Sequence, residues 1–161
     1  AYLGTRRIFR KGERWKFLVR GEVGYTDARV DSLDIDFGIG SEPVNVSVTE
    51  LPNFYRFKAG GSESVRGYGY ETLSNNDIGS NHIITASIEV ERKILEKWSA
   101  AAFFDIGNAF NDWNDPDLRK GVGFGIRWYS IAGPVSLDYA QALDVTGKPW
   151  RIHFTIGTPL L

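Results

Sequence analysis

Strict alternation of apolar and polar residues is the feature that most constrains how this chain can fold. It is clearest near the C-terminus, where apolar side chains alternate with polar ones: Ile152, Phe154 and Ile156 against Arg151, His153 and Thr155. The same pattern recurs in five further segments, which are separated by turn residues: 14–25, 81–92, 98–110, 120–130 and 133–141. Residues 2–10 are expected to form a further strand. A period of two is typical of a β-strand with one apolar face, so the chain is predicted to be all-β and antiparallel.

The lengths and flanks of these segments favour a membrane protein over a soluble one. Alternation by itself also fits a soluble β-sandwich, which buries one face and wets the other. Soluble strands average about five or six residues, whereas a tilted strand needs about 9 to 11 to cross a bilayer, which is close to these runs. Aromatic residues stand near the segment ends, as in an interfacial girdle: Trp15, Trp98, Phe110, Trp128, Tyr129 and Trp150. The polar faces carry charges, which suits a wet lumen, so we predict a transmembrane β-barrel.

Composition excludes several classes of protein and of site. The 161 residues carry a net charge of -1 and are 42% hydrophobic, which suits one domain over 1–161 and lacks the basic bias of a nucleic-acid binder. Cysteine is absent, which excludes disulfides and thiolate metal sites. No apolar run approaches the roughly 20 residues of a transmembrane helix. His82 and His153 lack metal-ligand spacing and are expected to be polar-face residues. The opening residues lack a signal-peptide pattern, so the chain is interpreted as a mature product or a cut piece.

Two segments interrupt the series of strands. Residues 33–50 hold two alternating runs around the sequence GSEP and are predicted to form an inserted hairpin, which either extends above the membrane or contributes strands of its own. Residues 51–81 are predicted to form a long loop in which glycines gather around Arg66. Such a loop is normally a flexible surface connection, because glycine loses the most backbone freedom on ordering. The lone arginine at its centre therefore needs an explanation.

The loop sequence RFKAGGSESVRGYGYETL closely resembles the signature loop of the outer-membrane insertase superfamily that includes BamA and TamA, the bacterial surface antigen family. In that family a long surface loop with a Val-Arg-Gly-Phe/Tyr motif folds back into the barrel. FFDIGNAF resembles the family's aromatic-x-Asp-x-Gly strand, and HFTIGTPLL resembles its closing strand. The resemblance covers residues 14–27 and 51–161, is nearer to TamA than to BamA, and leaves residues 28–50 as an insertion without a counterpart.

The resemblance implies a role for Arg66. It implies that the arginine of the motif pairs inside the lumen with an acidic residue of the next strand and with the aspartate of the strand after it, which map onto Glu89 and Asp105. The alternation independently places both carboxylates on the polar faces of neighbouring strands. An interior guanidinium needs such partners, because an unpaired buried charge is costly and arginine suits bidentate pairing. We therefore predict a lock between loop and barrel made of Arg66, Gly67, Tyr68, Glu89 and Asp105.

Glycines and the last strand complete the predicted site. The glycines expected to be structural are Gly60, Gly61, Gly67 and Gly69 in the loop, where tight turns in a crowded lumen are needed, and Gly107 in the aromatic-x-Asp-x-Gly strand. Phe154, Ile156 and Gly157 are predicted to lie on the strand at the barrel seam. Gly157 marks an expected bend or early end of pairing, and Pro159 cannot donate a ladder hydrogen bond, so this strand is expected to fray beyond Gly157.

The length of the chain raises the question of how a barrel would close. The resemblance implies a sixteen-stranded barrel preceded by soluble periplasmic repeat domains, whereas this chain supplies about seven membrane strands and a hairpin. It therefore resembles the C-terminal part of such a barrel. Lipid forbids unpaired strand edges, so three arrangements remain: a fragment of a longer parent, a small closed barrel of about eight strands, or an oligomer that shares strands. The implied location is the outer membrane of a Gram-negative bacterium.

Three classes of function remain open. The first is a factor for assembly or translocation of other proteins at the outer membrane, with the seam as a template for strand addition. The second is a dedicated two-partner secretion pore of the same superfamily, and the third is a passive channel or surface antigen. The implied partners are outer-membrane lipid, client outer-membrane or secreted proteins and an inner-membrane-anchored subunit, but no nucleic acid. No enzymatic activity, metal or cofactor is expected, since a catalytic pair of Glu89 and Asp105 has no companion nucleophile.

Overall fold

Strands make up the regular structure of the described chain. The computed structural model describes residues 1–27, 30–35, 44–49, 55–74, 78–131 and 133–157. Its strands are β1 (Tyr2–Lys11), β2 (Trp15–Tyr25), β3 (Val30–Ile35), β4 (Val44–Thr49), β5 (His82–Leu95), β6 (Trp98–Phe110), β7 (Arg119–Ser130), β8 (Gly133–Ala142) and β9 (Trp150–Ile156). In this part of the chain, no helix has the length and apolar character needed to cross a membrane.

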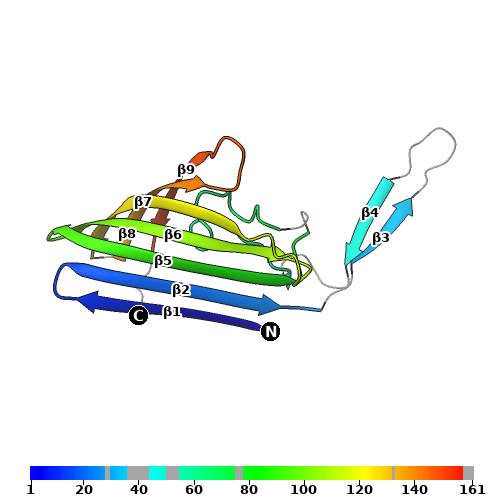
Figure 1. Ribbon diagram of the computed structural model, residues 1–161, viewed down its shortest axis with the longest axis horizontal. Coiled ribbons are helices and arrows are strands. Elements are labelled where there is room, and N and C mark those ends of the chain that lie inside the picture. Colours follow the sequence, from blue (N-terminus) through cyan, green and yellow to red (C-terminus); the bar gives the residue numbers. More distant parts are fainter. Residues whose placement is uncertain (28–29, 36–43, 50–54, 75–77, 132, 158–161) are drawn as a thin grey trace.

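One antiparallel sheet holds seven of these strands, in the order β1-β2-β5-β6-β7-β8-β9. Each strand pairs with its neighbour in the chain except across the long segment between β2 and β5 (Figure 1). β1 and β9 are the two edges, and within the described residues no pairing joins them. The predicted antiparallel all-β fold is confirmed, and the strands among the described residues do not close into a small barrel.

β3 and β4 form a separate two-stranded sheet that begins at Val30, three residues before the segment 33–50 predicted to be an inserted hairpin. Among the described residues neither strand joins the wall, so an eight-stranded closure through an arm of this hairpin is not the arrangement adopted. Both strands project from the end of the large sheet at which β2 ends (Figure 1). The predicted turn at 40–43 lies outside the described residues.

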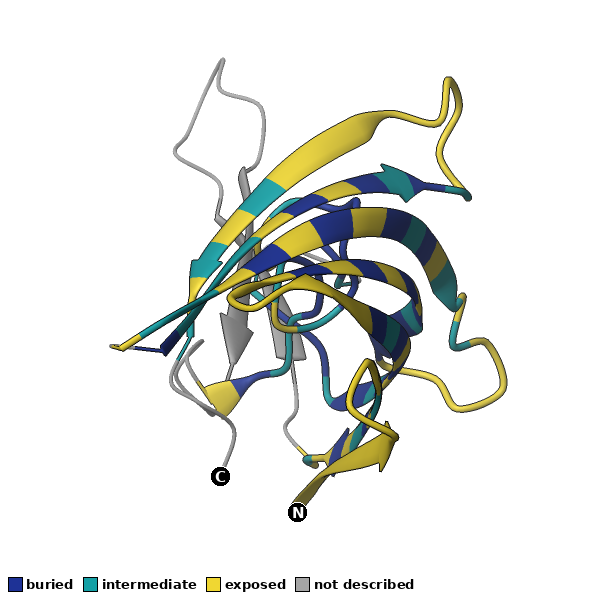
Figure 2. Ribbon diagram, turned by 90° about the vertical axis from the view of Figure 1, so that its left-hand side faces the viewer, coloured by how far each residue is buried: buried dark blue, intermediate teal, exposed yellow. Residues whose placement is uncertain are grey.

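From β5 to β9 the large sheet is apolar on its outer face and polar on its inner face, the reverse of a soluble domain. Outward-facing Ile88, Phe124 and Ile152 are 55%, 57% and 70% exposed. Residues buried on the inner face are mostly polar or charged: Thr85, Ser87, Glu89, Glu91, Asp105, Arg127 and Asp138. Figure 2 shows the resulting bands of exposed and buried residues along the central strands. Such a distribution is stable only where lipid covers the outside and a polar lumen fills the inside.

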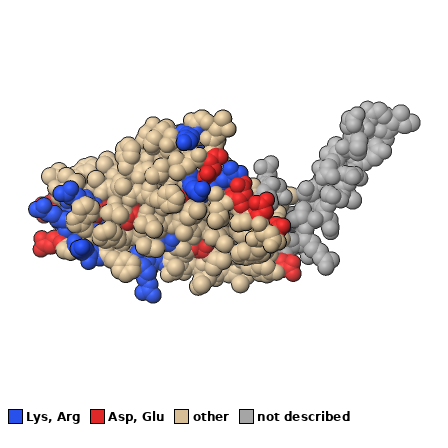
Figure 3. Space-filling model, viewed as in Figure 1, with Lys and Arg blue, Asp and Glu red and all other residues tan. Residues whose placement is uncertain are grey.

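Aromatic side chains mark both ends of the apolar band. At the end where β5 turns into β6, the rings of Trp98 and Trp128 lie 6.2 Å apart, and Trp15 begins β2 at the same end. At the opposite end, Tyr25 stacks on His82 with 5.0 Å between ring centroids. Lys and Arg side chains gather at the left of Figure 3, where the β1–β2 and β5–β6 turns lie, while most of the middle of the face seen there is neither basic nor acidic. This order of charged, aromatic and apolar zones is typical of a strand that spans a bilayer.

The loop between β4 and β5 folds back against the inner face of the sheet. Within it, Phe57 bridges to Ser80 and Ala59 bridges to Leu73. Apolar side chains of the loop and of three strands form one buried cluster: Ala59, Val65, Tyr68 and Leu73 with Ile83, Ala109 and Ala142. This cluster holds the loop inside the curve of the sheet and so carries Arg66 to the inner wall.

Phe124 tests whether the outer face contacts hydrocarbon, because it lies near the middle of β7 on that face. In the membrane-embedded protein, Phe124→Arg should lower the free energy of unfolding by about 2 to 4 kcal/mol, the cost of a cation at the bilayer midplane. Phe124→Leu is the control and should cost less than about 1.5 kcal/mol. Denaturant unfolding in lipid vesicles measures both. A stable monomer of this chain in detergent-free aqueous buffer would contradict the lipid-facing surface.

Candidate functional site

Arg66 lies at the centre of a buried cluster of charges on the inner face of the sheet. Its Nη1 donates to Glu89 Oε2 at 2.7 Å and to Asp138 Oδ2 at 3.2 Å. Its Nε and Nη2 donate to the two carboxylate oxygens of Asp105 at 2.8 and 3.0 Å, and Nη2 also donates to Ser87 Oγ at 3.3 Å. A guanidinium has five N–H donors, and these five bonds occupy all of them. The backbone N–H of Arg66 adds a bond of 3.0 Å to Asp105, whose side chain is fully buried.

An aromatic ring completes the seat of the guanidinium. The Cζ atom of Arg66 lies 3.3 Å from the centroid of the Phe103 ring, which projects inward from β6. Arginine is thereby bound in the two ways that suit its planar shape, by carboxylates at its edges and by an aromatic face. The position is 5% exposed, so the loop holds a charge that water alone does not solvate.

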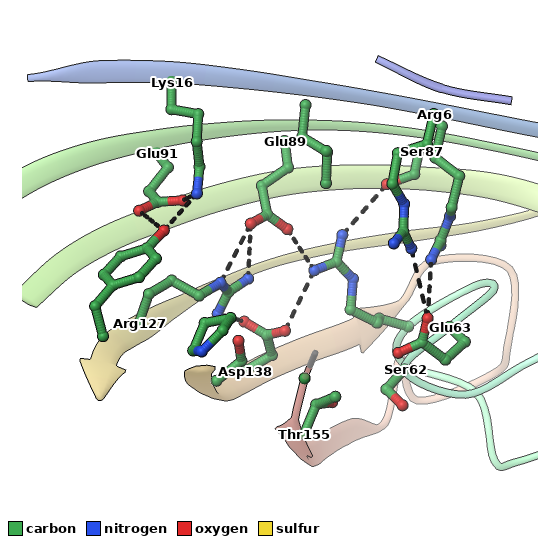
Figure 4. A pocket seen from close by; sticks show the side chains of 17 residues that line it. Arg6, Lys16, Ser62, Glu63, Ser87, Glu89, Glu91, Arg127, Asp138 and Thr155 are labelled. Carbon is green, nitrogen blue, oxygen red and sulfur yellow. Dashed lines mark hydrogen bonds and ion pairs between the residues drawn. The ribbon is translucent and has the colours of Figure 1, made fainter. Parts of the chain in front are cut away.

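Arg127 of β7 is a second guanidinium in the same cluster. It donates to Glu89 Oε1 through Nε and Nη2, at 3.2 and 2.9 Å, and to Asp138 Oδ1 through Nη1 at 2.5 Å. Glu89 and Asp138 thus each give one oxygen to Arg66 and the other to Arg127, which makes a closed ring of alternating charges. Figure 4 shows Arg127 between Glu89 and Asp138. Both oxygens of each carboxylate are therefore bound by guanidinium groups.

Strand register and glycines make room for this cluster. Ser87 of β5 stands directly opposite Asp105 of β6 and donates to its Oδ1 at 2.5 Å. On β7, a side chain at Gly121 would collide with the carbonyl oxygen of Arg66, and one at Gly123 would collide with the ring of Phe103. A Cβ atom at the next inward position of β7, residue 125, would strike Asp138. In the sequence KGVGFGIRWYS, the three inward-facing glycines therefore leave space on the inner face for the loop and the charged cluster, and Arg127 is the next inward-facing residue.

Gly67 and Tyr68 continue the contact of the loop with the wall. Gly67 has φ +96, a conformation that glycine adopts readily, and a Cβ there would lie 2.7 Å from the carbonyl carbon of Gln141 on β8. Tyr68 is 6% exposed, and its hydroxyl donates to the carbonyl of Lys120 at 3.2 Å. The backbone N–H of Gly67 donates to Nε2 of His153 on β9 at 3.0 Å.

The other predicted glycines stand at different kinds of position. Gly60 and Gly61 have φ values of +101 and +97, as tight turns require. Gly69 has no positive φ, but a Cβ there would lie 2.7 Å from the Cγ2 atom of Thr72. Gly107 of β6 faces β5, and a Cβ there would lie 2.7 Å from the Cα atom of Thr85. Gly60, Gly61 and Gly69 thus lie in the loop, and Gly107 lies on a strand of the wall. The structural role of each glycine stays a prediction.

The predicted seam residues lie on the outer face and edge of β9. Phe154 and Ile156 face outward and are 61% and 68% exposed. Regular pairing of β9 ends at Ile156, and the N–H of Gly157 still donates to the carbonyl of Pro134 on β8 at 2.9 Å. Residues 158–161, where fraying is expected, lie outside the described residues.

Water can reach one side of the charged cluster. A cavity of about 190 Å³ adjoins it, lined among others by Arg20, Glu63, Glu89, Arg127 and Thr155. Burial lowers the pKa of the Arg66 guanidinium, which belongs to the loop and not to a spanning strand, but Asp105 and Glu89 raise it more, and its pKa lies above the ordinary value. The charge is therefore permanent. Among the described residues, no three His, Asp or Glu side chains are placed to hold a metal ion.

Sequence reasoning singled out Arg66, Glu89 and Asp105, and the structure brings these three side chains together. It did not identify Asp138 or Arg127 as partners, although the alternation placed both on the polar faces of their strands. The predicted polar-face position of His153 did not reveal its bond to the loop. For Asp138, Arg127 and His153, the sequence predicts the face of the strand on which the side chain lies but not the residue that it binds.

Known proteins resemble both the sequence and the fold of this chain. Residues 8–159 match the Omp85 superfamily domain. The chain belongs to the Omp85 superfamily. Over 108 residues, which are 59% of this Omp85 chain and 14% of the relative, it is 31% identical to the outer membrane protein assembly factor BamA of Nitratidesulfovibrio vulgaris strain Hildenborough. The crystal structure of BamA from Haemophilus ducreyi lacking POTRA domains 1-3 has a TM-score of 0.64 and 18% identity, over 96% of this chain and 33% of that one.

These comparisons establish the superfamily, the fold and the location of the Omp85 chain. The predicted superfamily, the barrel-type fold and the outer membrane of a Gram-negative bacterium as location are confirmed. The Omp85 chain spans far less than two thirds of either relative. The nearer likeness to TamA and the action of the Arg66 cluster as a lock stay predictions.

Loss of the Arg66 side chain should release the loop of the Omp85 chain. Arg66→Ala removes five hydrogen bonds and leaves buried carboxylates without this cation, at a cost of about 3 to 5 kcal/mol in a dry site and less beside a wet cavity. Cleavage by chymotrypsin after Tyr68, which is 6% exposed, should then become fast, while the wall strands stay protected. Asp105→Asn should have a milder effect, and Arg66→Lys should restore protection only in part. Equal cleavage rates in the wild type and all variants would contradict the lock.

Arg127 should matter to the same contact although it lies on the wall. Arg127→Met leaves one oxygen each of Glu89 and Asp138 unpaired, so the free energy of unfolding should fall by up to about 3 to 5 kcal/mol and cleavage of the loop should quicken. Lys93→Met on β5 is the control, because Lys93 is exposed and its side chain forms no ion pair, hydrogen bond or ring contact within the described residues; it should change stability by less than about 0.5 kcal/mol. Comparable losses in the two variants would argue against a shared ring of charges.

Proposed function

We propose that this chain is the C-terminal barrel part of a factor that assembles other proteins into the outer membrane. Its last strand, β9, would serve as the template to which a strand of the client protein adds. Membership of the Omp85 superfamily supports the general role, and the relative that matches 59% of the chain is called an outer membrane protein assembly factor. The partners would be outer-membrane lipid and client β-barrel proteins, and an inner-membrane-anchored subunit stays a prediction.

The edge of β9 is the observation that carries this proposal. β9 is 7 residues long, whereas β5 is 14 and β6 is 13. It pairs with β8 on one side, and within the described residues no strand pairs with its other side. Unpaired backbone groups in hydrocarbon cost several kcal/mol each, so such an edge at membrane depth strongly favours any strand that can pair with it. Strand addition needs only backbone groups and is therefore compatible with many client sequences.

The Arg66 cluster would supply the rigidity that such a template needs. The loop binds side chains of β5, β6 and β8 through one guanidinium, so the wall beside β9 is held together from the inside. A client strand would then pair with a short edge strand mounted on a rigid wall. The mechanism requires no catalytic group and no cofactor, because the free energy comes from backbone pairing and burial of apolar surface.

A disulfide experiment tests strand addition in the full-length protein. The chain contains no cysteine, so Phe154→Cys places a single thiol of this chain on β9, and a client barrel carries one cysteine in its last strand. A crosslink should form while the client assembles and should disappear from later samples as the client is released. Phe104→Cys is the matched control, since Phe104 also faces outward but lies on β6, which has strand neighbours on both sides. Normal client assembly without any crosslink at Phe154→Cys would overturn the proposal.

A further inference from the structure

The loop reaches the last strand through one hydrogen bond in the described structure. The backbone N–H of Gly67 donates to Nε2 of His153 at 3.0 Å. His153 points inward from β9 and stands directly opposite Asp138 of β8, the carboxylate that also binds Arg66. The edge strand is thus joined to Gly67, the residue next to Arg66, whose guanidinium binds β5, β6 and β8.

Gly67 has little freedom to move away from this bond. The preceding residue is anchored by five side-chain hydrogen bonds of its guanidinium and one of its backbone. On the other side, the close approach of Gly67 to Gln141 blocks a shift toward β8. The N–H of Gly67 is therefore fixed in space by the charged cluster, and His153 meets it from β9.

The chemistry of the bond restricts what can stand at position 153. Nε2 accepts the hydrogen bond, so the imidazole is neutral and carries its proton on Nδ1. An acceptor at the same distance from the backbone is needed, and an amide oxygen could supply it. An aromatic ring of similar size could fill the space but could not accept the bond.

β9 depends on this bond more than the inner strands depend on theirs. Each of β5, β6, β7 and β8 pairs with a strand on both sides, whereas β9 pairs with β8 alone. Thr155, the next inward residue of β9, makes no hydrogen bond to the loop in the described structure and lines the cavity beside the cluster. The bond to Gly67 is thus the polar link between the loop and an edge strand that has one strand neighbour.

From this geometry we infer that His153 is a positioning residue that couples the state of the loop to the pairing of the last strand. When Arg66 and Gly67 are seated, β9 is held against β8; when the loop leaves its seat, β9 loses its inner support and pairs more weakly. The coupling runs both ways, because an energetic link between two sites is reciprocal. The function of β9 as a template rests on the proposed function, but the coupling itself does not.

Three single variants of the full-length protein in lipid vesicles test the link. His153→Phe removes the acceptor, His153→Gln retains one, and Thr155→Val alters the same face of the same strand without touching the loop. One hydrogen bond corresponds to a change of roughly two- to tenfold in an opening equilibrium. His153→Phe should therefore quicken cleavage after Tyr68 and amide exchange in 150–156 by that factor. His153→Gln should restore much of the protection, and Thr155→Val should leave cleavage unchanged.

A double-mutant cycle shows whether the two ends communicate. Asp105→Asn loosens the loop far from β9, and in the wild-type background it should quicken amide exchange in 150–156. In the His153→Phe background the link is already cut, so Asp105→Asn should no longer affect β9. Amide exchange in β6 (98–110) reports whether each variant is folded, since protection there should persist in all of them.

The outcomes separate this inference from the proposed function. Faster exchange in β9 without faster loop cleavage in His153→Phe, or additive effects of Asp105→Asn and His153→Phe, would overturn the coupling. Neither measurement uses a client protein. Intact coupling without client crosslinks at Phe154→Cys would leave the inference standing and remove the proposed function, and the reverse result would remove the inference alone.

Discussion

The buried positive charge of Arg66 is the constraint on which the arrangement of the loop and wall depends. A guanidinium on a glycine-rich loop stays on an inner wall only if that wall offers acceptors for its donors, because an unmatched charge would be drawn back to water. Glu89, Asp105 and Asp138 supply those acceptors from β5, β6 and β8. Their convergence requires strands that curve around the loop, so the local need for charge matching and the global curvature of the sheet support each other. The second guanidinium, from Arg127, balances carboxylates that one arginine alone would leave half paired.

Two different solvents explain why this sheet keeps its charges inside. Hydrocarbon on the outer face makes Phe124 and Ile152 favourable where a soluble protein would place polar residues, and the same medium makes charges costly on that face. The inner face is then the place for Glu89 and Arg127 within the spanning strands, and they must be satisfied there by each other or by water. The apolar cluster around Val65 and Tyr68 and the wet cavity beside Arg127 divide the interior into a dry part and a hydrated part. The Arg66 cluster lies between them, which gives it both firm packing and partial screening.

Much of this arrangement is encoded at the level of single strands, and the sequence reveals that part. A period of two is enough to assign Glu89, Asp105, Asp138 and His153 to the inner face and Phe154 to the outer face, because the side chains of a strand alternate strictly. Which inward residues meet is a different matter, since partners depend on register across several strands and on the path of the loop. The same period places Arg127 on the inner face, but it does not show that Glu89 and Asp138 bind Arg127 there. The role of the glycines at 121, 123 and 125 is likewise not predictable from the sequence, because the space that they leave is filled by Arg66, Phe103 and Asp138 only in the folded structure.

The number of contacts that hold a strand in place is smaller for β9 than for β5 to β8, for a physical reason. The central strands are held by neighbours on both sides and by charged contacts from the loop, whereas β9 has one strand neighbour, a short length and one hydrogen bond from Gly67. A strand so supported lies at the low end of local stability, where opening costs least. For β9 to accept a client strand as proposed, its edge must be neither fully paired nor fully free: the first would leave no backbone groups to offer, and the second would not stay in register. A short strand joined to the loop by one hydrogen bond satisfies both conditions, and under the inferred coupling the position of the loop affects how readily the edge of β9 pairs.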